Sequence, residues 1–143
     1  EIRVDKKSSF KINDNVKIDK NVRIIVTNGS DVVIGENTNI GYCTVMNCGS
    51  NLSIGKKCLI SGFVYIQCSD HGTKKNKYIK DQNHTHEDII IGDDVWIGAH
   101  STILKGTNVL QGSVIGSNTV VYRDTEAYSI NFGVPSRKVN TRK

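Results

Sequence analysis

Aromatic residues, proline and long apolar runs are all scarce in this chain. Aromatics make up 6% of its 143 residues, and proline occurs once. We therefore expect a core of isoleucine and valine in one domain, not a core assembled from large rings. No apolar run approaches the roughly 18 residues of a membrane span, and no charged and then apolar leader is present. These absences predict a cytoplasmic protein with no membrane span.

The chain has four cysteines, and its charge is only moderately positive. Cys43, Cys48, Cys58 and Cys68 include no CxxC motif and no close pair, so a disulfide framework is not expected. The formal net charge of +5 permits anionic ligands. The basic residues are scattered among acidic ones, which argues against a nucleic-acid partner.

What the chain does have is an aliphatic residue at every sixth position. The series is Ile91, Ile97, Ile103, Val109, Ile115 and Val121. A helix would repeat its apolar stripe every 3.6 residues and a half-buried strand every 2. A period of six, with a small or apolar residue four places on, predicts a hexapeptide β-solenoid in which each hexad supplies one short strand and one turn. Three hexads make one triangular coil, and the coils must stack to bury their aliphatic residues.

Glycine follows the aliphatic residue in several hexads. Gly92, Gly98 and Gly116 occupy this second position, where we expect either a positive φ or a close approach of backbones.

The same period covers most of the chain. We expect coils over residues 10–71 and 89–121, with residues 1–9 as a lead-in strand or frayed cap. Short insertions near residues 28–30 and 47–50 interrupt the period at a separation of about one coil. They are therefore expected to stack on one edge of the solenoid.

The period breaks once, at residues 66–71, where Asp70 falls at a position that should hold a small inward residue. Residues 72–88 form a long polar excursion, which we interpret as a protruding functional loop in preference to a disordered insertion. Residues 122–143 are expected to form a C-terminal extension whose basic tail covers the open end of the solenoid.

Several motifs together resemble a known family. The segment 94–98 (Asp-Val-Trp-Ile-Gly), the hexads up to Val121, and residues 128–130 followed by 133–137 resemble the hexapeptide-repeat acyltransferases. The resemblance is closest to the branch with galactoside and maltose acetyltransferases and polysaccharide O-acetyltransferases. It implies an all-β, left-handed parallel β-helix and a homotrimer with acetyl-CoA in the groove between neighbouring solenoids. It also implies a histidine as general base; separately, we expect no metal.

The resemblance identifies His71, in Ser69-Asp70-His71-Gly72, as the expected general base. Histidine has an unperturbed pKa of about 6.5 and is suited to accept a hydroxyl proton at neutral pH. Asp70 or a backbone carbonyl would orient its ring. The expected contacts to the cofactor, again from the resemblance, are Trp96, Ala99, Ser117, Tyr122, Arg123 and Arg137.

Other candidates leave alternatives open. His84 and His86 either line the acceptor pocket or are simply solvated. His100 is expected to face outward, and Trp96 to wall the groove or a subunit contact, because a buried indole would need a partner for its N–H. Cys68, His71, His84 and His86 are zinc-type ligands, but their spacing matches no zinc pattern.

The sequence therefore predicts an acetyl-CoA-dependent O-acetyltransferase. Its acceptor would be a carbohydrate hydroxyl of a surface polysaccharide or of a precursor. The alternatives are an N-acetyltransferase of a nucleotide-linked amino sugar, a γ-carbonic-anhydrase-like metalloenzyme and a non-catalytic scaffold.

Overall fold

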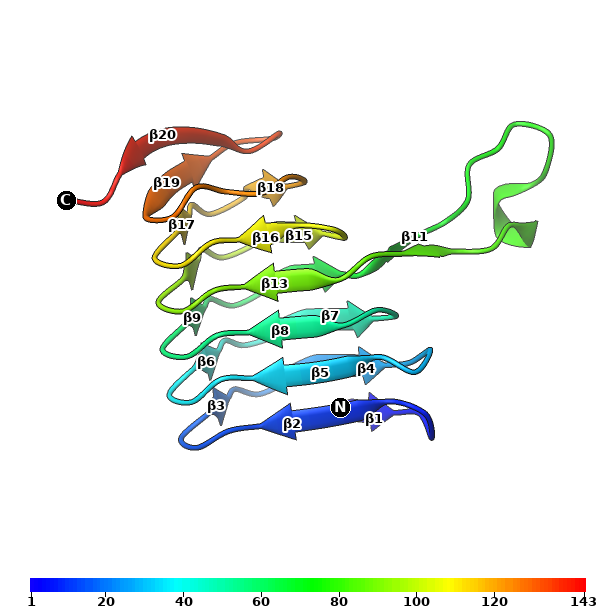
Figure 1. Ribbon diagram of the computed structural model, residues 1–143, viewed down its shortest axis with the longest axis horizontal. Helices are drawn as coiled ribbons and strands as arrows, with labels where there is room; N and C mark the ends of the chain where they lie inside the picture. Colours follow the sequence, from blue (N-terminus) through cyan, green and yellow to red (C-terminus); the bar gives the residue numbers. More distant parts are fainter.

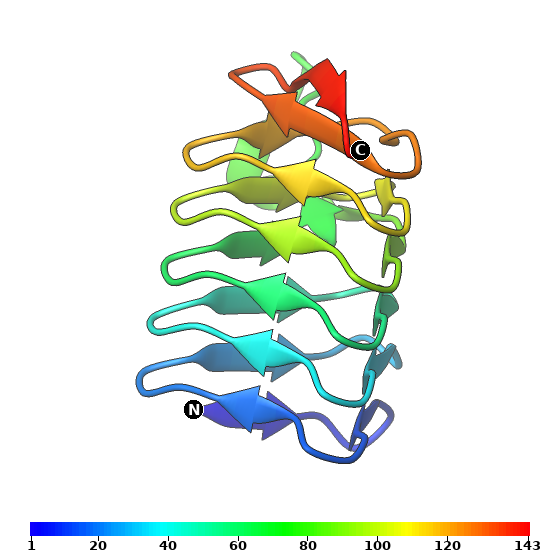
Figure 2. The same cartoon turned by 90° about the vertical axis from the view of Figure 1, so that its left-hand side faces the viewer.

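The chain folds into a triangular prism of stacked coils, described by a computed structural model that covers residues 1–143 (Figures 1 and 2). Three sheets of parallel strands form the faces of the prism, which we call faces A, B and C. The chain visits them in that order in each coil up to β18, after which β19 returns directly to the third face. The all-β solenoid predicted from the six-residue period is confirmed.

The strands are short and lie in register from coil to coil. Face A contains β1 (Ile2–Val4), β4 (Arg23–Val26), β7 (Val45–Cys48), β10 (Tyr65–Gln67), β15 (Thr102–Leu104) and β18 (Val120–Val121). Face B contains β2 (Ser9–Ile12), β5 (Asp31–Ile34), β8 (Leu52–Ile54), β13 (Ile89–Ile91) and β16 (Asn108–Val109). Face C contains β3 (Lys17–Ile18), β6 (Asn39–Ile40), β9 (Leu59–Ile60), β14 (Trp96–Ile97), β17 (Val114–Ile115), β19 (Ser129–Phe132) and β20 (Arg137–Thr141).

The core is a column of aliphatic side chains inside the prism. On face C, Ile40, Ile60, Ile97 and Ile115 are register partners in successive coils, and all four are buried. Because each inward residue contacts its counterpart one coil away, the stack buries apolar surface that a single coil would leave exposed. Cys58 is also buried in this core.

The close packing of the corners of the prism explains why glycine follows the inward aliphatic residue in several hexads. Gly98 has no positive φ; the left-handed residue of its turn is His100, with φ of 59°. A Cβ on Gly98 would lie 2.6 Å from the backbone nitrogen of Ser117 in the next coil. For Gly98, close approach of backbones is therefore the reason that applies.

The first coil begins earlier than the sequence suggested. β1 pairs in parallel with β4, so the coils start at Ile2 and not at residue 10. Ile2 and Val4 are exposed at the open end of the prism, and the six-residue period is weak there because these side chains have no coil beneath them.

The C-terminal extension completes the opposite end. β19 adds a parallel strand beside β17, and β20 turns back antiparallel to β19, so that β20 forms the last edge of face C (Figure 1). No helix in the chain is both long and apolar enough to cross a membrane.

Candidate functional site

A hairpin projects from the corner between faces A and B and carries the candidate site (Figure 1). It consists of β11 (Ser69–Asp70), a loop containing the 3-10 helix η1 (Ile79–Asp81), and β12 (Thr85–His86). We call residues 69–86 the site hairpin. The protruding loop predicted for residues 72–88 is thus present, and its base is an antiparallel ladder.

Asp70 does not point into the core, contrary to the inward position that the hexad count gave it. The chain leaves the coil at Cys68, which is buried, whereas Asp70 is exposed. The reason is that Ser69 and Asp70 pair with His86 and Thr85 of β12 and so belong to the hairpin and not to a hexad.

The ladder places two histidines opposite each other. Ser69 pairs with His86, and Asp70 with Thr85. Two residues further out, the Gly72 N–H donates to the Asn83 carbonyl at 3.2 Å. His71 therefore faces His84 across the hairpin, and cross-strand neighbours of this kind are close enough for their side chains to interact.

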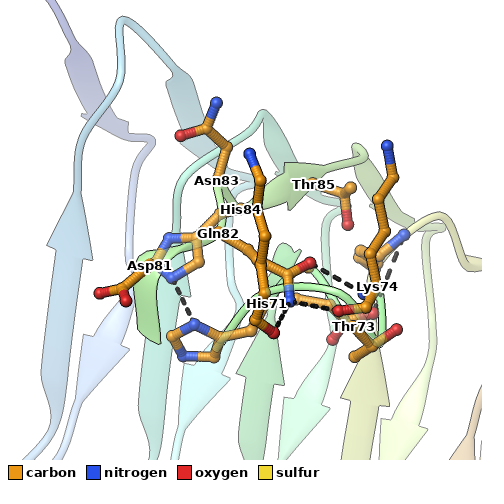
Figure 3. A pocket seen from close by; sticks show the side chains of 12 residues that line it. His71, Thr73, Lys74, Asp81, Gln82, Asn83, His84 and Thr85 are labelled. Carbon is orange, nitrogen blue, oxygen red and sulfur yellow. Dashed lines mark hydrogen bonds and ion pairs between the residues drawn. The ribbon is translucent and has the colours of Figure 1, made fainter. Parts of the chain in front are cut away.

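The two rings form a hydrogen-bonded pair, which we call the histidine pair. Nδ1 of His71 lies 2.9 Å from Nε2 of His84, and the ring planes are at 79° with centroids 4.2 Å apart (Figure 3). Nε2 of His71 has no hydrogen-bond partner in the chain, which leaves it available to a substrate. Both side chains are exposed.

The loop beyond the pair is closed by one glutamine. The Gln82 Oε1 accepts from the Lys74 N–H at 2.8 Å, and its Nε2 donates to the carbonyls of Lys74 and Lys77 at 2.9 and 3.0 Å (Figure 3). An amide that satisfies three backbone groups holds the two sides of the loop together just beyond His71 and His84.

The base of the hairpin is tied to the next coil by Lys105. This side chain is only 16% exposed and makes ion pairs with Glu87 and, at 3.8 Å, with the Asp70 carboxylate. Asp70 thus faces Lys105 and makes no hydrogen bond to His71. The group bonded to the His71 ring is His84, whereas the sequence suggested Asp70 or a carbonyl.

An open cleft of about 950 Å³ lies beside the histidine pair. No hydrophobic residue lines it. Its lining consists of Asp70, His71, Gly72, Thr73, Lys74, Lys77, Asp81, Gln82, Asn83, His84, Thr85 and Lys105. Such a lining of polar and charged residues offers hydrogen-bond donors and acceptors, which suits a strongly hydrated ligand. His86 lies outside this lining, and its ring is close to Gly49.

The residues expected to bind the cofactor fall into two groups. Tyr122, Arg123 and Arg137 come together: the Arg137 guanidinium donates to the Tyr122 hydroxyl at 3.2 Å, and Arg123 lies 4.5 Å above the Tyr122 ring. Because β18 pairs with β15, Tyr122 and Arg123 follow face A at the same corner as the site hairpin.

The second group lies at the corner between faces C and A. Ala99 and Ser117 belong to neighbouring coils there, and the Asn118 N–H donates to the Ala99 carbonyl at 2.9 Å. Trp96 lies on the outside of face C, 51% exposed, with its indole N–H 3.3 Å from the Ser61 hydroxyl. Face A separates this group from the site hairpin by about 13 Å, the length of four strand residues.

The same corner contains an aromatic ladder that the sequence analysis did not find. His100 is exposed, as expected, and stacks on Phe63 with ring centroids 4.8 Å apart. Phe63 in turn contacts Tyr42 edge to face at 5.5 Å. The only sequence signal is their occurrence at similar positions of three successive corners.

The zinc-type residues do not converge. No three His, Cys, Asp or Glu side chains are arranged to hold a metal ion. Cys68 is buried in the core beside Cys48, and the hydrogen bond with Cys68, together with burial, raises the pKa of the Cys48 thiol far above its usual range. Cys68 is therefore separated from the exposed histidine pair by its position inside the coil.

Comparison with known proteins agrees with this fold. Residues 88–123 match the family model described as bacterial transferase hexapeptide (six repeats). Residues 88–123 therefore carry hexapeptide repeats of this kind, in agreement with the stacked parallel strands.

Proteins similar to this chain are named as acetyltransferases. The chain is 34% identical over 110 residues to a probable acetyltransferase of Mycobacterium tuberculosis, covering 76% of this chain and 37% of the relative. It is 35% identical over 127 residues to the polysialic acid O-acetyltransferase of Escherichia coli O1:K1, covering 85% and 41%. The crystal structure of the polySia-specific acetyltransferase NeuO has a TM-score of 0.82 at 31% identity, covering 94% and 62%. The chain thus spans less than half the length of these two curated relatives.

Proposed function

We propose that this protein is an acetyl-CoA-dependent O-acetyltransferase that acts on a carbohydrate hydroxyl, with His71 as general base. The observation that supports this most is the His71 ring at the polar cleft, with one nitrogen bonded to His84 and the other unpaired. The relatives named as acetyltransferases, one of them specific for polysialic acid, support the same reaction class.

The chemistry requires little more than a positioned base. A thioester is already activated, so the acceptor hydroxyl must chiefly lose its proton as it attacks the acetyl carbon. Nε2 of His71 takes that proton, the new C–O bond forms, and the C–S bond breaks. The proton then passes to the leaving thiolate, so that the histidine returns to its neutral form. General-base catalysis of this kind contributes typically 10²–10⁴-fold.

The donor site is proposed to lie between subunits. The Tyr122, Arg123 and Arg137 cluster combines two guanidinium groups with an aromatic ring, which suits the phosphates and base of a nucleotide. Trp96, Ala99 and Ser117 lie at another corner of the same prism. A homotrimer in which the corner between faces A and B of one solenoid meets the corner between faces C and A of its neighbour would unite the two groups.

The acceptor is proposed to be a sugar of a surface polysaccharide or of its precursor. A cleft without hydrophobic lining favours a substrate that presents hydroxyls and amides. An acyl-CoA donor is an intracellular metabolite, so the cytoplasm is the proposed compartment.

The test is thiol release from acetyl-CoA in the presence of a panel of soluble glycans, with CoA binding measured by calorimetry. His71→Ala should lower turnover by about 10²–10⁴-fold and leave the affinity for CoA within about twofold, which shows that the fold and donor site are intact. Unchanged turnover in this variant would remove His71 from the mechanism. Absence of CoA binding by the unaltered protein would contradict the donor.

Light scattering tests the assembly separately. A mass of about three chains is expected, and a stable monomer that still turns over would contradict a site shared between subunits.

A further inference from the structure

We propose that His84 is a positioning residue for the base of this reaction. In this arrangement Nδ1–H of His71 donates to Nε2 of His84, which leaves the lone pair of His71 Nε2 directed at the cleft. The inference rests on the function proposed above and assigns a role to a second residue of the same site.

The geometry supports a directed hydrogen bond in preference to a chance contact. The two residues are opposite one another in an antiparallel ladder whose pairs on either side are present, Asp70 with Thr85 and Gly72 with Asn83. The nitrogen-to-nitrogen distance is 2.9 Å, which is ordinary for a hydrogen bond. The nearly perpendicular rings, at 79°, bring one nitrogen toward the other and do not stack the faces.

No other group of the site competes for His71. The Asp70 carboxylate faces Lys105 at 3.8 Å, and the Asp81 carboxylate pairs with Lys80 at 3.2 Å. A carboxylate or a carbonyl is the usual partner that fixes a histidine tautomer. Here an imidazole nitrogen occupies that place, and one imidazole can accept from another only through an unprotonated nitrogen.

The tautomer decides which chemistry is available. If Nδ1 of His71 carries the proton, Nε2 is a base that can accept the proton of the acceptor hydroxyl. If His84 donates instead, the proton of neutral His71 sits on Nε2, and the ring cannot act as a base there. During turnover His71 becomes doubly protonated, and neutral His84 continues to accept from Nδ1 until the Nε2 proton passes to the leaving thiolate.

The charged neighbours of the pair come from every part of the site. Asp70 is on β11, Asp81 on η1, and Lys74 and Lys77 are in the loop, while Lys105 follows β15 in the next coil. His86 on β12 has its ring centroid 6.0 Å from that of His84. These groups stay in place in the His84 variants below, and His86 is replaced only in a control, so a change in the tautomer reports on His84 itself.

The first test needs no substrate. Nitrogen-15 NMR of the imidazoles, assigned with His71→Ala, reports which ring nitrogen carries the proton at a pH where the signals show neutral rings. We expect Nδ1–H for His71 in the unaltered protein and a mixture of tautomers in His84→Leu, with His86→Ala retaining Nδ1–H. A His71 ring protonated on Nε2 in the unaltered protein would overturn the proposal.

The second test uses turnover and separates positioning from folding. His84→Leu should lower kcat by about 10- to 100-fold, part of the contribution of the base, with KM for acetyl-CoA within about twofold. His84→Gln places an amide oxygen near the lost nitrogen and should restore kcat to within about fivefold of the unaltered protein. Equal losses in the leucine and glutamine variants, or no loss in the leucine variant, would overturn the proposal.

The two proposals fail separately. If no glycan is acetylated but His71 carries its proton on Nδ1 only when His84 is present, the positioning role of His84 is supported and the proposed reaction is contradicted. If acetyl transfer depends on His71 but His84→Leu changes neither tautomer nor kcat, the reaction stands and the positioning role is wrong.

Discussion

The Ser50 hydroxyl donates to the Asp88 carboxylate at 2.5 Å, a contact that closes the exit of the site hairpin onto the coil below it. The same carboxylate accepts from the Asn51 backbone N–H at 3.0 Å and from the Asn51 side-chain amide at 3.2 Å. These bonds, that from Ser50 first, lower the pKa of Asp88 below its usual range. These bonds, which we call the Asp88 clamp, hold the chain to the coil below at the point where it rejoins face B.

Asp88→Asn should loosen this clamp and with it the site hairpin. Asparagine keeps one acceptor oxygen but loses the charge that strengthens the bonds from Ser50 and Asn51. The lysine-rich loop should then be cleaved by trypsin at least about threefold faster under native conditions, because cleavage follows local opening. Asp31→Asn is the matched control, since the Asp31 carboxylate accepts from Ser9 at 2.6 Å, two coils below Asp88 on face B and on the side away from the hairpin. Equal acceleration in both variants would contradict a local clamp.

The lowered pKa of Asp88 also predicts a pH dependence with a defined sign. A carboxyl whose pKa is lower in the folded state stabilises that state above its unfolded value of about 3.9, and this contribution is lost as pH falls through the folded value. Thermal unfolding midpoints measured between neutral pH and pH 3 should therefore fall less steeply in Asp88→Asn than in the unaltered protein at the acid end. Parallel curves would show that the carboxylate makes no such contribution.

Gly98→Ala should separate two neighbouring coils. The added Cβ would meet the Ser117 backbone nitrogen at 2.6 Å, and backbone held in a parallel ladder cannot move aside without breaking register. We expect a loss of about 3 kcal/mol in the free energy of unfolding, the upper range for overpacking. Gly29→Ala is the comparison: its φ of 71° strains an alanine, but its nearest neighbour is 3.8 Å away, so about 1 kcal/mol is expected. Urea denaturation measures both, and the opposite ranking would contradict this account of the corner glycines.

Thr107→Val should be neutral or stabilising. The Thr107 hydroxyl is buried without a hydrogen-bond partner, so the isosteric valine removes an unsatisfied group and is expected to gain up to about 1 kcal/mol. Thr38 occupies an equivalent inward position, but its hydroxyl donates to the Gly55 carbonyl at 2.8 Å and accepts from the Cys58 N–H at 3.1 Å. Thr38→Val should therefore cost about 1–3 kcal/mol. Denaturant titration of the two variants tests both expectations. A destabilised Thr107→Val variant would contradict the interpretation that the Thr107 hydroxyl is unsatisfied.

The coils could be predicted from sequence because the six-residue period of the inward side chains corresponds to one strand and one turn of the solenoid. Ile97 and Ile115 are 18 residues apart and are register partners, so a count along the chain is also a count of coils. The count was wrong at the start of the first coil and at Asp70, in each case for a physical reason. Ile2 and Val4 belong to a coil whose lower side is open, and Asp70 follows the last inward residue before the hairpin.

The candidate site could be predicted only in part. His71 was found from a motif, but its partner depends on which residues of the hairpin face each other, and hexad counting does not reach into the hairpin. A signal was present: Ser69, Asp70 and His71 precede the loop, and His84, Thr85 and His86 follow it, which permits a ladder with the two histidines opposite. The aromatic ladder through Phe63 was missed because bulky residues are uncommon at left-handed positions, and Phe63 has φ of 60°.

Arg137→Ala tests whether the cluster at the corner after β18 binds the nucleotide part of the donor. The Arg137 guanidinium holds the Tyr122 hydroxyl at 3.2 Å and is exposed, so its loss should weaken ground-state and transition-state binding alike. We expect KM for acetyl-CoA to rise about tenfold with kcat within about twofold, the pattern of lost uniform binding.

The matched control is Arg142→Ala in the same tail. Arg142 bonds the Asp94 carboxylate at 2.8 Å and the Gly112 carbonyl at 3.0 Å, so its loss should lower the unfolding midpoint and leave KM unchanged. Calorimetry with CoA and with pantetheine, which lacks the nucleotide, completes the comparison. If Arg137 contacts the nucleotide, Arg137→Ala weakens binding of CoA and leaves pantetheine unaffected. Equal weakening of both ligands, or an equal effect on KM from Arg142→Ala, would mean that the tail contributes to the fold and not to donor recognition.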